Sequence, residues 1–235
     1  MTKYSIVVIL SALLPLNVWA IPELQLDIEG GFYVGGTEES TLTNASSFTL
    51  NALALTTTYD STLTYAISIG IVNNHNGIAD GTDFGSFKVG GVSYNVGDTI
   101  WDIPPDQFFD PNLSKDLDIQ KHGIFPTEFL QVGVDFGSAS TISSYNVQDG
   151  SSGSSGELMY KVDFLIDASG LLAGFDLHFD LYGYDPTAKK VEVKAPFSHD
   201  AGTAEITKIP EPSIIALLGM GLFGLGLLGR RRSRQ

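Results

Sequence analysis

The chain has 235 residues, no cysteine, and 27 acidic against 13 basic residues, which gives a formal net charge of −14 at pH 7. The lack of cysteine excludes disulfide bonds and cysteine nucleophiles. The negative charge makes nucleic acid and anionic membrane surfaces unfavourable partners. The length is that of one domain with a sizeable apolar core and short segments at its ends.

The first 20 residues have the pattern of a secretory signal peptide. Lys3 supplies a short positive region, residues 6–16 are apolar, and Val18 and Ala20 are small residues at the positions that a signal peptidase reads. We expect cleavage after Ala20. The alternative, a buried N-terminal helix, is disfavoured because prolines lie in its last turn and just beyond it.

Residues 21–208 show the period-two alternation of β-strands and no sustained helical period. Strands are expected at 49–56, 63–69, 87–89, 93–96, 129–136, 159–164 and 175–182. Glycine pairs, Asp-Gly and Asp-Pro fall between them as turn signals. This pattern predicts one all-β domain, a β-sandwich of jelly-roll or immunoglobulin-like type. With 26 acidic residues and eight lysines, its charge is about −18, which fits solubility outside the cell or binding of divalent cations.

Residues 73–83, rich in Asn, Asp and Gly, are the first candidate for an ion site. Their amide and carboxylate oxygens are ligands that calcium prefers. The segment does not fit an EF-hand loop, since Val72 would take the first ligand position. An ordinary Asn/Asp/Gly turn is the alternative, and no cofactor is therefore assigned, with calcium as the ion hypothesis.

Two stretches are expected to lie outside the strands. Residues 98–122 are rich in Asp and Pro and predict a long surface excursion. Residues 150–156, Gly-Ser-Ser-Gly-Ser-Ser-Gly, predict a flexible tether of low complexity. Strand-like segments flank this tether on both sides, so we expect it to be a hairpin loop within one domain.

The strand at 175–182 places its apolar residues on one face and Asp176, His178 and Asp180 on the other. Side chains on one face are about 6.5 to 7 Å apart along a strand, so this row could coordinate a metal ion. The alternative is a solvated outer face, and no metal site is assigned.

No enzymatic activity is expected. The chain contains neither a G-x-S-x-G elbow nor an H-E-x-x-H motif. Ser198, His199 and Asp200 are three residue types of a catalytic triad, but neighbours in the chain do not normally form that relay, whose members converge from separate positions. A turn after the last strand is the simpler interpretation.

Carbohydrate binding is the alternative function, because flat rings exposed in a row can stack on sugars. The rings available for such a surface are Trp101, Phe108, Phe109, Tyr145, Tyr182 and Tyr184. Two or three of them exposed in one groove would favour binding, and rings packed inside would favour a structural role.

The C-terminal segment, residues 209–235, combines three features in a fixed order. Pro210, Glu211 and Pro212 come first, and an apolar run at 214–229 follows. All four arginines of the chain come next, close to its last residue, Gln235: Arg230, Arg231, Arg232 and Arg234. Arginines beside an apolar run mark the membrane face that is not crossed, so everything upstream is expected to be outside the cytoplasm.

This order resembles the PEP-CTERM sorting signal of Gram-negative bacteria. The resemblance implies processing by an exosortase, and signal peptidase is the processing enzyme expected from the N-terminal segment. An ordinary C-terminal anchor helix is the alternative. Residues 213–229 would span about 25 Å against an apolar core of about 30 Å, and five glycines weaken the helix further. A single membrane helix that holds the protein until processing is therefore expected.

Five stretches of the central domain resemble the choice-of-anchor N family of surface proteins. They are residues 24–31, 122–127, 145–149, 177–182 and 195–201. The resemblance implies an extracellular domain with no assigned biochemical activity. The sequence therefore predicts an exported, non-catalytic surface or matrix protein of the Gram-negative envelope, membrane-anchored before processing and associated with the envelope, exopolysaccharide or biofilm.

Overall fold

The computed structural model describes residues 21–35, 40–73, 78–105 and 123–203. This part of the chain is all-β apart from two short 3-10 helices, η2 (Phe136–Ser138) and η3 (Phe197–His199). The strands are β1 (Leu24–Ile28), β2 (Phe32–Val34), β3 (Ser40–Thr43), β4 (Ser47–Leu55), β5 (Thr64–Val72), β6 (Phe87–Val89), β7 (Val92–Tyr94), β8 (Ile100–Asp102), β9 (Thr127–Val134), β10 (Ser140–Ser143), β11 (Leu158–Asp167), β12 (Asp176–Asp185), β13 (Lys190–Lys194) and β14 (Asp200–Thr203).

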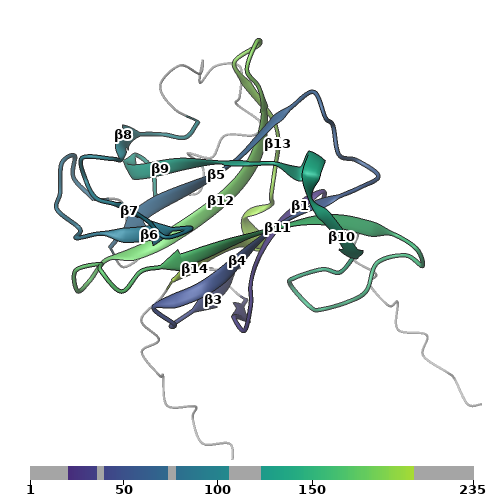
Figure 1. Cartoon of the computed structure of the whole chain (residues 1–235), viewed down its shortest axis with the longest axis horizontal. Coiled ribbons are helices and arrows are strands. Elements are labelled where there is room, and N and C mark those ends of the chain that lie inside the picture. The colour runs from purple at the N-terminus through teal and green to yellow at the C-terminus, as the bar shows by residue number, and fades with distance from the viewer. Residues whose placement is uncertain (1–20, 36–39, 74–77, 106–122, 204–235) are drawn as a thin grey trace, which may run out of the picture.

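The strands form two sheets, as the all-β prediction requires (Figure 1). A six-stranded sheet has the order β1-β4-β11-β6-β7, with β10 paired to β11. An eight-stranded sheet has the order β2-β3-β14-β12-β5-β9-β8, with β13 paired to β12. The strand pairs are antiparallel except for β3 and β14, which run parallel. The fold is thus a β-sandwich with one parallel pair.

The main core lies between the two sheets and follows the predicted alternation. Leu177, Phe179 and Leu181 of β12 face it from the larger sheet, and Leu26 and Leu50 face it from the smaller one. The Phe179 ring meets the Phe48 ring edge to face, with centroids 6.0 Å apart. Burial of a side chain of this size contributes about 1.5 to 3 kcal/mol. The inward face of β12 is therefore a principal source of stability.

The outer face of the larger sheet is also covered, which the sequence did not predict. A second cluster packs there, with Ile124 and Phe125 of the segment before β9 against Ala66, Phe129 and Tyr182 of the sheet. As a result β12 is buried on both faces over most of its length. Polar residues on the outer face of β12 are consequently removed from water.

The Gly/Ser-rich segment lies between the paired strands β10 and β11, as the hairpin prediction required. It is held by hydrogen bonds along its length. Gly153 N donates to Ser144 O at 2.9 Å, and the Glu157 carboxylate accepts from Ser144 Oγ at 2.9 Å and from Ser154 N at 3.3 Å. A Cβ at Gly153 would come within 1.9 Å of Ser144 Oγ. Close packing, in addition to flexibility, therefore explains the glycine.

Several short strands were not predicted by the alternation of apolar and polar residues. β3 and β14 are polar, and β8 lies inside the segment expected to be a surface excursion. β8 pairs with β9, so the excursion begins with a strand of the larger sheet. Residues 106–122 of that segment lie outside the described residues. These strands form by pairing with segments far away in the sequence, β14 with β3 and β12, and β8 with β9, and hydrophobic periodicity does not report such nonlocal pairing.

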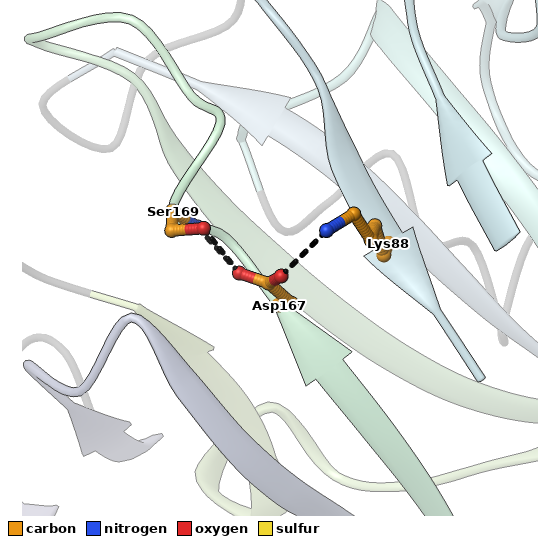
Figure 2. A network of polar contacts seen from close by, with 3 residues as sticks. All are labelled: Lys88, Asp167 and Ser169. Carbon is orange, nitrogen blue, oxygen red and sulfur yellow. Dashed lines mark hydrogen bonds and ion pairs between the residues drawn. The ribbon is translucent and has the colours of Figure 1, made fainter. Parts of the chain in front are cut away.

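The surface where β11 meets β6 carries an ordered polar network. Figure 2 shows Asp167 between Lys88 and Ser169. The Lys88 ammonium lies 3.0 Å from one Asp167 oxygen, and Ser169 N donates to the other at 3.0 Å. Hydrogen bonds from Ser169 and the nearby Lys88 charge lower the pKa of Asp167 to about 2. The network closes the turn after β11.

Candidate functional site

His178 and Asp180 lie on the outer face of β12, as the alternation predicted, but this face is not solvated. His178 is 7% exposed to solvent and Asp180 is 5% exposed. The predicted solvated face is wrong because the second apolar cluster and neighbouring strands cover it. His178 Nε2 lies 3.7 Å from Asp180 Oδ2. Ser68, opposite Asp180 on β5, points its hydroxyl at the same oxygen at 3.4 Å.

The third member of this group is Asp200 of β14, which is 1% exposed. Its Oδ2 lies 3.5 Å from His178 Nε2. The register brings it there, since Phe179 pairs with Ala201 and His178 pairs with Gly202. The expected member Asp176 instead accepts a hydrogen bond from Thr203 Oγ1 at 3.2 Å. The structure thus assembles His178, Asp180 and Asp200, a set that spacing along one strand could not reveal.

Charge on this group is set by two opposing effects. Burial lowers the pKa of His178, but the Asp180 and Asp200 carboxylates outweigh it and raise the pKa to about 10. Without a metal ion the imidazole therefore carries a proton at neutral pH. In the described part of the chain, this is the one group of three histidine or acidic residues whose ligand atoms converge, all within 4.8 Å of one another.

Ser198, His199 and Asp200 do not form a relay. Asp200 points to His178, whereas the His199 ring turns toward Asn146 in the loop between β10 and β11. His199 Nε2 lies 2.9 Å from Asn146 Oδ1, and Nδ1 lies 2.8 Å from Ser198 Oγ. Asn146 Oδ1 also accepts from Gln148 N, so it is the acceptor and His199 Nε2 is the donor. Ser198 then donates to Nδ1.

The electrostatics of His199 are opposite to those of His178. Burial lowers the pKa of His199 to about 4, and the Asp149 carboxylate opposes this only in part. The ring is therefore neutral at pH 7. It connects η3 of the larger sheet's C-terminal region to the loop of the smaller sheet, which is a structural contact between the two layers.

In the segment considered for calcium binding, residues 73–83, the described polar groups make hydrogen bonds within the protein. Residues 74–77 lie outside the described residues. Asp83 Oδ1 accepts from Gly85 N at 2.9 Å, which is a local turn contact. Gly81 N donates to Glu128 Oε1 at 2.8 Å, and Thr99 Oγ1 donates to the other oxygen of Glu128 at 2.7 Å. Glu128, which sequence reasoning missed, thus ties this turn to β9.

The aromatic residues considered for sugar binding do not form an exposed row in the described part of the chain. Tyr182 is buried and donates to Gln131 Oε1 at 2.7 Å. Tyr145 is half-buried and donates to Asp27 Oδ2 at 2.6 Å, and burial together with this carboxylate raises the pKa of Tyr145. Trp101 and Tyr184 are half-buried. Phe108 and Phe109 lie outside the described residues.

The predicted sorting elements also lie outside the described residues. These are the signal peptide at 1–20, Pro210, Glu211 and Pro212, the apolar run at 214–229, and Arg230, Arg231, Arg232 and Arg234. Over the described ranges there is no helix of a length and apolarity that would cross a bilayer. The last described strand, β14, ends at Thr203.

Comparison with known proteins bears on this C-terminal segment. Residues 208–232 match the family model described as the PEP-CTERM protein-sorting motif. Comparisons with curated proteins and with solved structures find no match. The motif covers the Pro-Glu-Pro sequence, the apolar run and the first three arginines. The chain therefore carries a PEP-CTERM sorting motif, which implies export, a C-terminal membrane-anchoring signal and processing by an exosortase.

Proposed function

We propose that this chain is a non-catalytic protein of the cell surface or extracellular matrix, left in the Gram-negative envelope or in exopolysaccharide after an exosortase has processed it. The observation that carries the proposal is the sorting motif at residues 208–232. The resemblance of residues 21–208 to the choice-of-anchor N family supports an extracellular domain of this kind. We assign the domain no membrane role of its own after processing.

The non-catalytic part of the proposal is supported by the arrangement of the candidate triad. Asp200 is turned toward His178, and Asn146 occupies the position beside His199 where a triad would hold a carboxylate. A neutral amide stabilises a developing imidazolium less well than a carboxylate does. The Ser198 and His199 contacts are accounted for by packing of η3 on the loop at 144–157.

Carbohydrate binding has less support. In the described residues the exposed large apolar side chains include one aromatic ring, Phe32, and the others are aliphatic. A single ring is a poor platform for a polysaccharide, which is bound by several coplanar rings. Association with exopolysaccharide is therefore proposed as retention within a matrix, without a dedicated sugar groove on the described surface.

The processing step can be tested in a Gram-negative host that produces the full chain with and without its exosortase. We expect the exosortase to shorten the chain at its C-terminus and move it from the membrane fraction to the outer envelope or medium. Intact-mass spectrometry and immunoblots of cell fractions measure both changes. Glu211→Ala should abolish the exosortase-dependent shortening because it removes the charged residue of the Pro-Glu-Pro sequence.

Pro186→Ala is the matched control, since Pro186 is an exposed turn residue between β12 and β13. It should be processed as the wild type is. Identical C-termini with and without exosortase would contradict the processing step. A purified chain that is retained by an isolated polysaccharide column, and released by free oligosaccharide, would instead favour the carbohydrate-binding alternative.

A further inference from the structure

The group formed by His178, Asp180 and Asp200 has the composition and spacing of a metal site. It offers one imidazole nitrogen and two carboxylate oxygens from two neighbouring strands, β12 and β14. All three residues are more than nine-tenths buried. Imidazole and carboxylate are the ligand types of zinc and related divalent transition metals.

The distances fit coordination better than direct contact. His178 Nε2 lies 3.5 Å from Asp200 Oδ2 and 3.7 Å from Asp180 Oδ2. Charge-assisted hydrogen bonds are about 2.7 to 2.9 Å long. Two ligands on one zinc ion, each bonded at about 2.0 to 2.1 Å in a tetrahedron, lie about 3.3 to 3.4 Å apart. Two of the three ligand separations, 3.5 and 3.7 Å, are therefore slightly longer than the edges of a coordination tetrahedron, and all three ligand atoms lie within 4.8 Å of one another.

The two residues paired with His178 on the neighbouring strands are both glycines. Gly70 of β5 pairs with His178 on one side and Gly202 of β14 on the other. A Cβ at Gly202 would meet Leu177 O at 3.2 Å and Leu42 Cδ2 at 3.3 Å, which is tighter than ordinary contact. The Phe125 ring and the Thr127 methyl group fill the space over Gly70, 3.5 Å from where a Cβ would lie. A Cβ at Gly202 would also lie 3.9 Å from His178 Nδ1. Asp180 and Asp200 lie in the neighbouring row of the β12–β14 ladder.

The charge of the group also favours a bound metal ion. A metal ion takes the place of the proton on His178 Nε2, so the imidazole in the metal-bound site is neutral and the two buried carboxylates carry two negative charges, which are costly to bury uncompensated. A divalent cation would cancel this charge. Calcium fits poorly because it takes six to eight oxygen ligands. The Ser68 hydroxyl, 3.4 Å from Asp180 Oδ2, is one further oxygen donor beside the group.

We propose that His178, Asp180 and Asp200 bind one divalent transition-metal ion, with Zn²⁺ as the best match, in a buried structural centre that joins β12 to β14. The three ligands leave one tetrahedral position for a further donor. The site lies within the β-sandwich, so the inference does not depend on the sorting signal or on its processing.

The test uses the full chain, purified in detergent from a host without exosortase and dialysed against a chelator. Zn²⁺, Mn²⁺ and Ca²⁺ are added in separate arms, and excess ion is removed. We expect one Zn²⁺ per chain by elemental mass spectrometry and a higher Tm than in the metal-free protein. Asp180→Asn and Asp200→Asn should each weaken Zn²⁺ binding at least tenfold, because mutating even a residue that only supports a metal ligand typically costs 10 to 100-fold in affinity.

Asp163→Asn is the matched control. Asp163 is an exposed carboxylate 3.2 Å from Lys161, on the other sheet, so its removal should leave Zn²⁺ binding unchanged. If all three variants retain Zn²⁺ as the wild type does, the bound ion is elsewhere and the proposal is wrong. A wild type that retains no Zn²⁺ would overturn it equally, and His178 would then be the protonated centre of an ion cluster.

A second measurement needs no variant and so does not depend on whether the variants fold. Co²⁺ in a four-coordinate site absorbs visible light strongly, and it shifts the NMR signals of a bound imidazole. We expect both signatures when the wild-type chain is loaded with Co²⁺, and we expect Zn²⁺ to displace them. The weak spectrum of hydrated, six-coordinate Co²⁺ would contradict the site.

Discussion

His178 and His199 are both buried on neighbouring elements, yet they are held in opposite charge states. His178 lies between two carboxylates, and its pKa is raised to about 10. His199 lies between a hydroxyl and an amide oxygen, and burial lowers its pKa to about 4. The comparison shows that the partners, more than burial itself, decide whether a buried imidazole is charged.

The largest expected effect comes from removing the charged histidine. His178→Gln leaves the Asp180 and Asp200 carboxylates buried without their cation, so in chelator the free energy of unfolding should fall by roughly 3 to 5 kcal/mol. Urea denaturation followed by circular dichroism measures it. Lys161→Gln removes a partly exposed cation beside the exposed Asp163 and should change stability by less than about 1 kcal/mol. If the two substitutions lowered the free energy of unfolding equally, burial would not make the His178 charge more important for stability than the Lys161 charge.

The neutral histidine, His199, predicts a loss of stability at acid pH that is of intermediate size. The unfolded chain, with a histidine pKa of about 6.5, takes up a proton before the folded chain does. Stability from neutral His199 is therefore complete above pH 6.5 and is lost as pH falls toward 4. The stability difference between wild type and His199→Gln should shrink by about 1.4 kcal/mol per pH unit over this window, on the order of 3 kcal/mol in all.

Denaturation midpoints at pH 7, 6, 5 and 4 measure this difference, and using the variant as reference cancels the carboxylates that titrate in the same range. A constant difference across the window would mean that His199 is charged in the folded protein. His178 and His199 would then both be protonated in the folded protein.

The smallest expected effect is at Ser198. Ser198→Ala removes the hydroxyl that donates to His199 Nδ1 and leaves a buried acceptor, at a cost of about 1 kcal/mol. Ser138→Ala is the control, because Ser138 makes an exposed contact with Asp135, and it should cost less. A loss with Ser198→Ala as large as that with His178→Gln would indicate that Ser198 has a role beyond this one hydrogen bond.

The longer strands could be predicted from the sequence because alternation is a local property. β4, β5, β9, β11 and β12 all fall close to their predicted ranges. β3 and β14 could not be predicted in this way, because Ser-Thr-Leu-Thr and Asp-Ala-Gly-Thr become strands by pairing with each other, and with β2 and β12 respectively. Parallel pairing joins segments far apart in sequence, and no spacing rule reports it.

The candidate metal group shows the same limit. His178 and Asp180 were recognisable because they are two residues apart on one strand. The sequence predicts a turn at Asp200, whereas its place beside Asp180 follows from the register of β12 and β14. The covered outer face was missed as well, because the residues that cover it, such as Phe125, are brought there by a loop.

The position of β14 has a mechanical consequence. It is the last described strand before the segment that matches the sorting motif, and it lies inside the larger sheet with β3 on one side and β12 on the other. Tension applied through a tethered C-terminus enters the domain at this strand. It must act against two hydrogen-bonded ladders at once, whereas an edge strand could be peeled away from one. A domain tethered by its C-terminus would therefore resist load at the strand where the load enters.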